Sequence, residues 1–143
     1  MTLLEVKSLN TYYGESHILR DVDMSLNSGE MVCLIGRNGV GKTTLLKSLI
    51  GLLKPRGGDI IFKGTSLLRK EPHRRAKLGV GYVPQGREII PYLTVEENLL
   101  IGLEALPGGL TKNKNIDPLV YDLFPILKDF LQRKGGDLSG GQQ

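Results

Sequence analysis

The sequence predicts an α/β fold that opens with antiparallel strands and ends in a helical subdomain. Predicted strands and helices alternate through the middle of the chain, which is typical of α/β proteins. After Gln85 the pattern changes to helices and loops. We therefore expect two parts, residues 1–85 and residues 86–143, with the second part beginning near Gly86.

The composition is that of a globular protein. The chain has 143 residues, of which 40% are hydrophobic and 24% charged, and this mixture excludes a disordered or fibrous protein. The longest apolar run, residues 31–35, is far shorter than the roughly 18 residues of a membrane span, and the N-terminus lacks the pattern of an export signal. A single cysteine excludes an intramolecular disulfide and a thiolate metal cluster and favours the cytoplasm. The net charge of +4 is too small to require a nucleic-acid partner.

The N-terminal residues predict an antiparallel pair of strands. Residues 4–9 form the first expected strand, a break follows at Tyr13 and Gly14, and apolar and polar side chains alternate over residues 22–27. Residues 31–35 are apolar at every position, which predicts a strand covered on both faces, with Cys33 as a small core residue.

A helix is expected from Lys42 to Gly51, because leucine and isoleucine recur there at helical spacing. Beyond it, residues 59–63 predict a strand, residues 71–78 a short basic helix and residues 80–84 a buried strand.

Two helix starts are expected in the second part. Thr94 and Glu97 have the spacing of a capping box, and Asp117 precedes a proline that can occupy the first helical position. A polar loop is expected between the two helices, over residues 107–115.

A glycine-rich motif between the strand at 31–35 and the following helix predicts a phosphate site. Residues 36–43, called the P-loop below, fit G-x-x-x-x-G-K-S/T. Glycines let several backbone N–H groups approach phosphate oxygens, and a helix N-terminus adds positive potential. Lys42 would bridge the β- and γ-phosphates of a nucleotide, and Thr43 would bind Mg²⁺. The alternative is a turn that binds nothing. The predicted phosphate-binding residues are Gly36, Arg37, Asn38, Gly39, Val40, Gly41, Lys42, Thr43 and Thr44.

A second motif lies at residues 138–142, which read L-S-G-G-Q. A hydroxyl residue and two glycines can form another phosphate-sized group of N–H donors, although such a loop is by itself more often a linker. Together with the P-loop, this motif resembles the ATP-binding subunits of ATP-binding-cassette (ABC) transporters. The resemblance implies a P-loop ABC ATPase fold and a head-to-tail dimer with a second ATP-binding subunit. In that dimer, Ser139 and Gly141 of one chain would cap the γ-phosphate held by Lys42 of the other, and the nucleotide-binding residues of this motif would be Ser139, Gly140, Gly141 and Gln142.

Two further residues match the pattern of this family. Gln85 corresponds to the glutamine that contacts Mg²⁺ and the attacking water, and Tyr13 to the aromatic residue that stacks on adenine. Tyr12 could instead be the residue that stacks on adenine. The structural alternatives are that Gln85 is only an exposed polar residue and that the tyrosine only packs against its neighbours. The resemblance thus implies Lys42, Gln85 and Ser139 as catalytic residues and Thr43 and Gln85 as the metal site.

Residues 84–89 and 93–99 are similar to the ATP-binding subunits of branched-chain amino acid importers and, more closely, of urea and short-chain amide importers. This resemblance implies coupling of ATP hydrolysis to solute import at the cytoplasmic face of the inner membrane, with permease subunits as direct partners and a solute-binding protein as an indirect one. The permease would dock at the apolar cluster after Gln85, formed by Ile89, Ile90, Pro91 and Tyr92, unless these residues are core. A soluble ABC ATPase acting on nucleic acid or the ribosome and a non-catalytic nucleotide-binding fragment are the alternative functions.

Members of the family continue past the second motif, whereas this sequence ends at Gln143. The Walker B aspartate, the catalytic glutamate and the switch histidine of the family have no counterpart in it. We therefore expect this chain to bind ATP without useful turnover. We also expect an unpaired sheet edge beside residues 31–35, with marginal stability or self-association as the result.

The remaining polar candidates have simple expected roles. His17 and His73 are expected to be ordinary surface residues. The basic residues Arg69, Lys70, Arg74, Arg75 and Lys77 predict a solvated helix face, with an anionic partner as the alternative.

Overall fold

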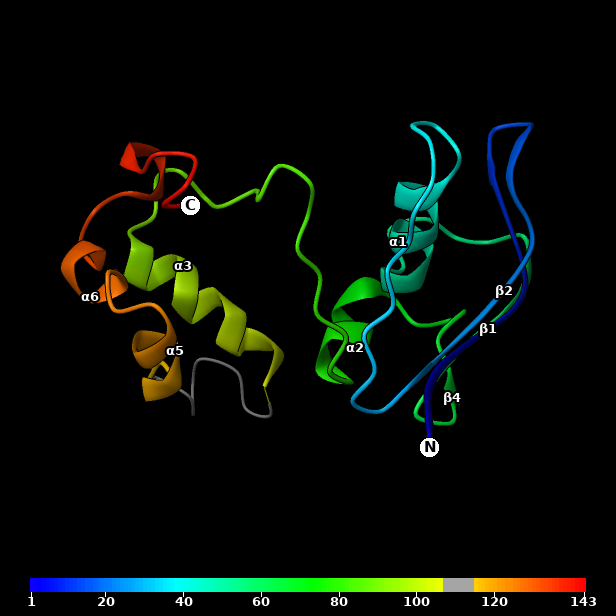
Figure 1. The fold of residues 1–143 in the computed structure, drawn as a ribbon, viewed down its shortest axis with the longest axis horizontal. Helices are drawn as coiled ribbons and strands as arrows, with labels where there is room; N and C mark the ends of the chain where they lie inside the picture. Colours follow the sequence, from blue (N-terminus) through cyan, green and yellow to red (C-terminus); the bar gives the residue numbers. More distant parts are fainter. Residues whose placement is uncertain (107–114) are drawn as a thin grey trace. The chain divides into compact units, whose positions relative to one another are not determined.

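The computed structural model describes residues 1–106 and 115–143. Contacts divide the chain into two compact units, Met1–Gly81 and Tyr82–Gln143, and each is described by itself. The boundary between these units falls shortly before Gln85. Figure 1 gives the course of the chain in both units.

The first unit is built on an antiparallel sheet with strand order β2-β1-β3-β4. Strands β1 (Thr2–Tyr13) and β2 (Ser16–Asn27) form a long hairpin, β3 (Gly57–Phe62) pairs with the other edge of β1, and β4 (Thr65–Ser66) follows β3. The expected antiparallel opening is therefore confirmed, and the hairpin turn at Gly14 has the left-handed φ of 55° that glycine adopts easily.

Helix α1 (Lys42–Ile50) packs on one face of this sheet (Figure 1). Their shared core consists of six buried side chains: Val6, Leu9, Leu19, Leu45, Ile60 and Leu67. The predicted helical spacing is confirmed, because Leu45 enters this core and α1 ends at Gly51, whose φ is 88°. A second short helix, α2 (Pro72–Lys77), follows within the same unit.

The two predicted buried strands at residues 31–35 and 80–84 are not formed. Both segments lie outside the strands, and Met31 and Ile35 are 96% and 86% exposed. Cys33 is exposed as well, so its expected core position is wrong. The physical reason is that an apolar run becomes a strand only when its N–H and C=O groups find a partner strand. Within residues 1–106 and 115–143, no segment pairs with either run.

The second unit contains short helices. Helix α3 (Val95–Ile101) continues into η1 (Gly102–Ala105), and α5 (Pro118–Leu123), α6 (Leu127–Phe130) and η2 (Gly135–Asp137) follow. The predicted capping box is confirmed: Thr94 Oγ1 accepts from the Glu97 N–H at 3.1 Å, and Glu97 Oε2 accepts from the Thr94 N–H at 2.7 Å. Asp117 caps α5 as predicted. Most of the predicted polar loop at 107–115 lies outside the described residues.

Backbone hydrogen bonds join the start of α3 to the chain at and just before the start of η2. The Val95 N–H donates to the Arg133 carbonyl at 2.9 Å, and the Gly135 N–H donates to the Leu93 carbonyl at 2.8 Å. The second unit is thus held together by main-chain bonds as well as by apolar contacts. Among the described residues, no helix has the length and apolar character to cross a bilayer.

Candidate nucleotide-binding site

The P-loop enters α1 through two glycines in left-handed conformations, Gly39 with φ 81° and Gly41 with φ 104°. Gly41 is the N-cap residue, and within the described chain no side chain caps this end and no acidic residue lies in the first turn. The first N–H groups of an α-helix lack intrahelical acceptors and carry the positive end of its dipole. This end of α1 therefore suits an anion.

The predicted phosphate-binding lysine folds back onto its own loop. Lys42 Nζ donates to the carbonyl oxygens of Gly36 and Arg37, each at 2.6 Å. Both acceptors belong to the P-loop, so the ammonium group already stands over the loop. The two carbonyl groups are weaker acceptors than phosphate oxygens, and an arriving phosphate can therefore replace them.

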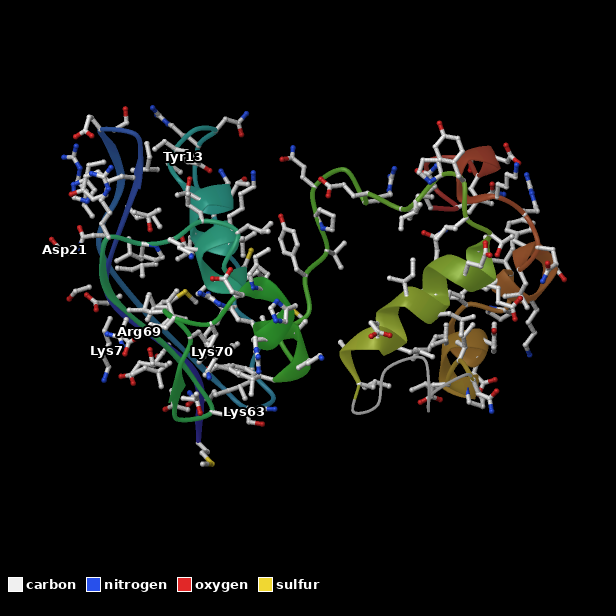
Figure 2. The ribbon with its side chains drawn as sticks, turned by 180° about the vertical axis from the view of Figure 1, so that it is seen from behind. Lys7, Tyr13, Asp21, Lys63, Arg69 and Lys70 are labelled. Atoms are coloured by element: carbon white, nitrogen blue, oxygen red, sulfur yellow. The ribbon has the colours of Figure 1, made fainter. Side chains whose placement is uncertain are left out.

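Contact with the hairpin fixes the position of Gly41. A Cβ atom on this residue would lie 2.9 Å from Leu19 Cδ2 and 3.3 Å from Ile18 Cγ2, so only glycine fits without a shift. Leu19 pairs with Thr11, and Tyr13 follows two residues later at the end of β1. Figure 2 labels Tyr13 at the end of the hairpin, beside the loop that leads into α1. The structure therefore brings Tyr13 and the P-loop to the same end of the first unit.

The ring of Tyr12, the alternative adenine-stacking residue, is already in contact with two side chains. The His17 ring stacks on it with centroids 4.1 Å apart, and Arg56 Cζ lies 4.7 Å from its centroid. His17 is also hydrogen-bonded to Asn10 Oδ1 at 2.8 Å. His17 is thus a half-buried member of a stack rather than an ordinary surface residue, whereas His73 is exposed as expected. Tyr13 remains 47% exposed.

Gln85 is exposed and lies in a turn of the second unit. The two residues that follow this turn, Arg87 and Glu88, have left-handed φ values of 64° and 53°. The Arg87 guanidinium then reaches the second motif, since a Cβ on Gly140 would lie 3.4 Å from Arg87 Nη1. The structure therefore places the segment after Gln85 beside the L-S-G-G-Q loop.

The L-S-G-G-Q loop is an exposed turn closed by its own glutamine. Gln142 Oε1 accepts from the Ser139 N–H at 2.9 Å, and the Gln142 N–H donates to the Ser139 carbonyl at 2.9 Å. The Ser139 N–H is consequently engaged, while Ser139 itself is exposed. Sequence reasoning missed this role of Gln142, although S-x-x-Q is a capping-box pattern.

A cavity of about 340 Å³ lies in the second unit, close to this loop. Its lining is mostly apolar and includes Ile89, Ile90, Val95, Leu99, Leu127 and Leu138. Beside it, Ile90 and Tyr92 are 43% and 86% exposed. The apolar cluster after Gln85 is therefore only partly used as core.

The position of Arg75 differs most clearly from the one predicted from the sequence. It was expected on a solvated face, yet it is 1% exposed, and only its neighbours Arg69, Arg74 and Lys77 are exposed. Its Nη1 donates to the carbonyls of Ser48 and Leu49, both at 2.8 Å, at the end of α1. Burial lowers the pKa of the Arg75 guanidinium from its ordinary value, and the Glu71 carboxylate opposes this shift. The local sequence carried no signal for this burial, because two of the carbonyl acceptors lie on α1.

Within the described residues, no cluster of three or more histidine, cysteine, aspartate or glutamate side chains could hold a metal ion. The predicted metal residues Thr43 and Gln85 belong to different units.

The family match and the similar curated relatives agree on one protein family. The family described as ABC transporter matches residues 19–143. The chain is 40% identical over 141 residues to the probable branched-chain amino acid transport ATP-binding protein LivF of Archaeoglobus fulgidus, covering 99% of this chain and 59% of that protein. It is 36% identical over 144 residues to the high-affinity branched-chain amino acid transport ATP-binding protein BraG of Pseudomonas aeruginosa, covering 99% of this chain and 60% of that protein. The chain thus spans about three fifths of the length of these curated relatives.

Solved structures of ATP-binding cassettes are also similar to this chain. A nucleotide-free ATP-binding cassette from an ABC transporter is 34% identical with a TM-score of 0.76, covering 99% of this chain and 61% of that one. A dimeric post-hydrolysis ATP-binding cassette bound to ADP and Pi is 26% identical with a TM-score of 0.80, covering 98% of this chain and 65% of that one.

Proposed function

Because the chain belongs to the ABC transporter family, we propose that it is the nucleotide-binding part of an ATP-binding subunit that couples ATP binding and hydrolysis to solute import. The observation that carries this proposal is the open N-terminus of α1, with Lys42 poised over the P-loop and Tyr13 at the same end of the unit. Triphosphate on the loop and adenine against Tyr13 is the arrangement that these positions favour.

The residues at the helix start also suit Mg²⁺. Thr43 is the second residue of α1 and is exposed, and a hydroxyl beside a phosphate is the hard oxygen ligand that Mg²⁺ prefers. The metal would neutralise charge on the transferred phosphoryl group. We propose Gln85 as the second protein ligand and as the residue that orients the attacking water.

We propose that Ser139 and Gly141 act on the nucleotide of a second ATP-binding subunit in a head-to-tail dimer. Their exposed loop supports this role, and related ATP-binding cassettes form dimers. Gln142 would keep the loop in shape through the Ser139 N–H, which leaves the Ser139 hydroxyl as the group that faces phosphate.

A permease subunit would dock at the apolar cluster of residues 89–92, beside the 340 Å³ cavity. The exposure of Ile90 and Tyr92 supports this surface. The subunit would then lie peripherally on the cytoplasmic face of the inner membrane, with a solute-binding protein as an indirect partner. The named relatives favour branched-chain amino acids as the solute, and urea or short-chain amides are the alternative from the motif at 84–89.

Equilibrium binding of Mg-ATP tests the proposal. The wild-type chain should bind, and Lys42→Ala should lose most of its affinity because the ammonium no longer meets the phosphates. Lys47→Ala, at the other end of the same helix, is the matched control and should bind like wild type. Equal affinities of Lys42→Ala and wild type would refute the P-loop assignment. Phosphate release by the same samples tests our expectation that the 143-residue chain binds without useful turnover.

A further inference from the structure

The buried polar side chains of the described residues gather around one helix. Thr11, Thr44, Ser48 and Arg75 are each at most 6% exposed, and all four lie on α1 or contact it. Thr11 Oγ1 and Ser48 Oγ are 3.2 Å apart, and the Ser48 hydroxyl donates to the Thr44 carbonyl at 2.8 Å. Strand β1, helix α1 and helix α2 are thereby joined by polar contacts inside the first unit.

Arg75 is the strongest member of this network. Its Nη1 donates to two consecutive carbonyls of the last turn of α1, and its Nε donates to the Lys70 carbonyl at 2.8 Å. Within residues 1–106 and 115–143 its side chain has no carboxylate within ion-pair distance. The buried charge is therefore balanced by the negative end of the α1 dipole, by the three carbonyl groups and, beyond ion-pair distance, by the Glu71 carboxylate.

The fit around the guanidinium is close on the side of the helix end. A Cβ on Gly51 would lie 2.8 Å from Arg75 Nε and 2.9 Å from its Cζ. The glycine that ends α1 thus also leaves the space that the guanidinium fills. A planar group with donors in fixed directions, packed this closely, restricts where the helix end can lie.

Burying an arginine is not the simplest way to stabilise such a contact, because an apolar side chain of similar volume avoids the desolvation cost. A directional bond to chosen carbonyls instead fixes where the helix stands along its axis. Since α1 is a short rigid helix, a displacement of its last turn displaces its first turn as well.

We propose that Arg75 is a positioning residue for the nucleotide site: by binding the Ser48 and Leu49 carbonyls it fixes the axial position of α1, and so the position of Gly41 to Thr43 against phosphate. This inference rests on the proposed function. A merely structural role would lower stability and leave the affinity of the folded protein unchanged.

The test compares Mg-ATP affinity with stability in matched variants. Arg75→Met keeps the apolar stem and removes the donors, and Arg75→Lys keeps the charge and part of the donor capacity. Ile60→Val deletes one buried methyl group from β3 and is the destabilising control, and Arg74→Met is the exposed control on α2. Melting curves by circular dichroism define a temperature at which every variant is folded, and the Kd is measured there.

Arg75→Met should bind Mg-ATP at least about tenfold more weakly than wild type, with Arg75→Lys in between and both controls like wild type. Sucrose, which raises stability by exclusion from the surface, should raise the melting temperature of Arg75→Met without restoring its Kd. An unchanged Kd in folded Arg75→Met and Arg75→Lys, or a Kd that sucrose restores, overturns the inference. If Arg75→Met does not fold, Arg75→Lys alone decides by the same criteria. Absence of binding by wild type overturns the proposed function and this inference together, whereas wild-type binding that both arginine variants retain overturns only the inference.

Discussion

Two adjacent tyrosines at the end of β1 have different surroundings. The Tyr12 ring stacks on His17 and lies against the Arg56 guanidinium, whereas Tyr13 is half exposed at the end that also holds the P-loop. The register of β1 is irregular between Thr11 and Tyr12, so the surroundings of each ring, and not the strand period, distinguish the two tyrosines. Thr11 contacts α1 through Ser48, which holds this part of β1 against the helix, and Tyr13 is the more exposed of the two tyrosines.

Tyr13→Ala should therefore weaken Mg-ATP binding by removing an aromatic stacking partner, which is worth about 1–3 kcal/mol for a base. Binding of inorganic triphosphate, which has no base, should change little, and isothermal calorimetry with both ligands separates the two effects. Tyr12→Ala is the matched variant and should lower the melting temperature by breaking the stack on His17 while sparing the Kd. A reversal of these two results would assign adenine to Tyr12.

At the level of elements, the two P-loop glycines predict different costs of substitution. Both have left-handed φ values, but a Cβ on Gly41 meets Leu19 in the core, whereas a Cβ on Gly39 meets nothing within 4 Å. Gly41→Ala should lower the free energy of unfolding by about 1–3 kcal/mol more than Gly39→Ala, because backbone strain is joined by a steric overlap. Urea unfolding of both variants measures the difference. Equal midpoints would mean that the contact with the hairpin is dispensable.

The helix α3 carries a second test at this level. Thr94→Ala removes the hydroxyl that accepts from the Glu97 N–H, and should cost about 1 kcal/mol in the stability of the second unit. Thr94→Ser, which keeps the hydroxyl, is the control and should cost less. Proteolysis of the second unit under native conditions gives the readout. Equal cleavage rates of Thr94→Ser and Thr94→Ala would contradict the capping role of the hydroxyl.

The sequence predicted those elements whose determinants are local. The hairpin, α1 and both helix caps depend on spacing, glycine and side-chain oxygens within a few residues of each other, and all formed as expected. The runs at 31–35 and 80–84 were wrong because a fully apolar strand depends on distant partners that no local pattern specifies. Arg75 was wrong for the related reason that its acceptors lie on another helix. The P-loop, Tyr13, Gln85 and the L-S-G-G-Q loop came from motifs, and their roles in catalysis stay predictions.

For the whole molecule, the exposed apolar runs predict self-association. Met31, Ile35 and Val83 are each at least 84% exposed, and exposed apolar side chains on unpaired backbone favour contact with other chains. Met31→Lys combined with Val83→Lys should reduce dye binding to apolar surface and give sedimentation that no longer depends on protein concentration. Asn115→Lys adds charge elsewhere and should change neither property. A wild-type chain that is monomeric and melts sharply without nucleotide would contradict this prediction.

Cys33 stands in the same exposed run, three residues before the P-loop, and it is the single cysteine of the chain. This thiol gives the native sequence a single site for labelling. A maleimide dye attaches at one known atom, next to the region where nucleotide is expected. Its fluorescence would report nucleotide arrival without any engineered residue. Because the thiol is accessible, air oxidation can also join two copies covalently through Cys33. A reducing agent cleaves this covalent pair and leaves association through apolar contact intact, so it distinguishes the two kinds of dimer.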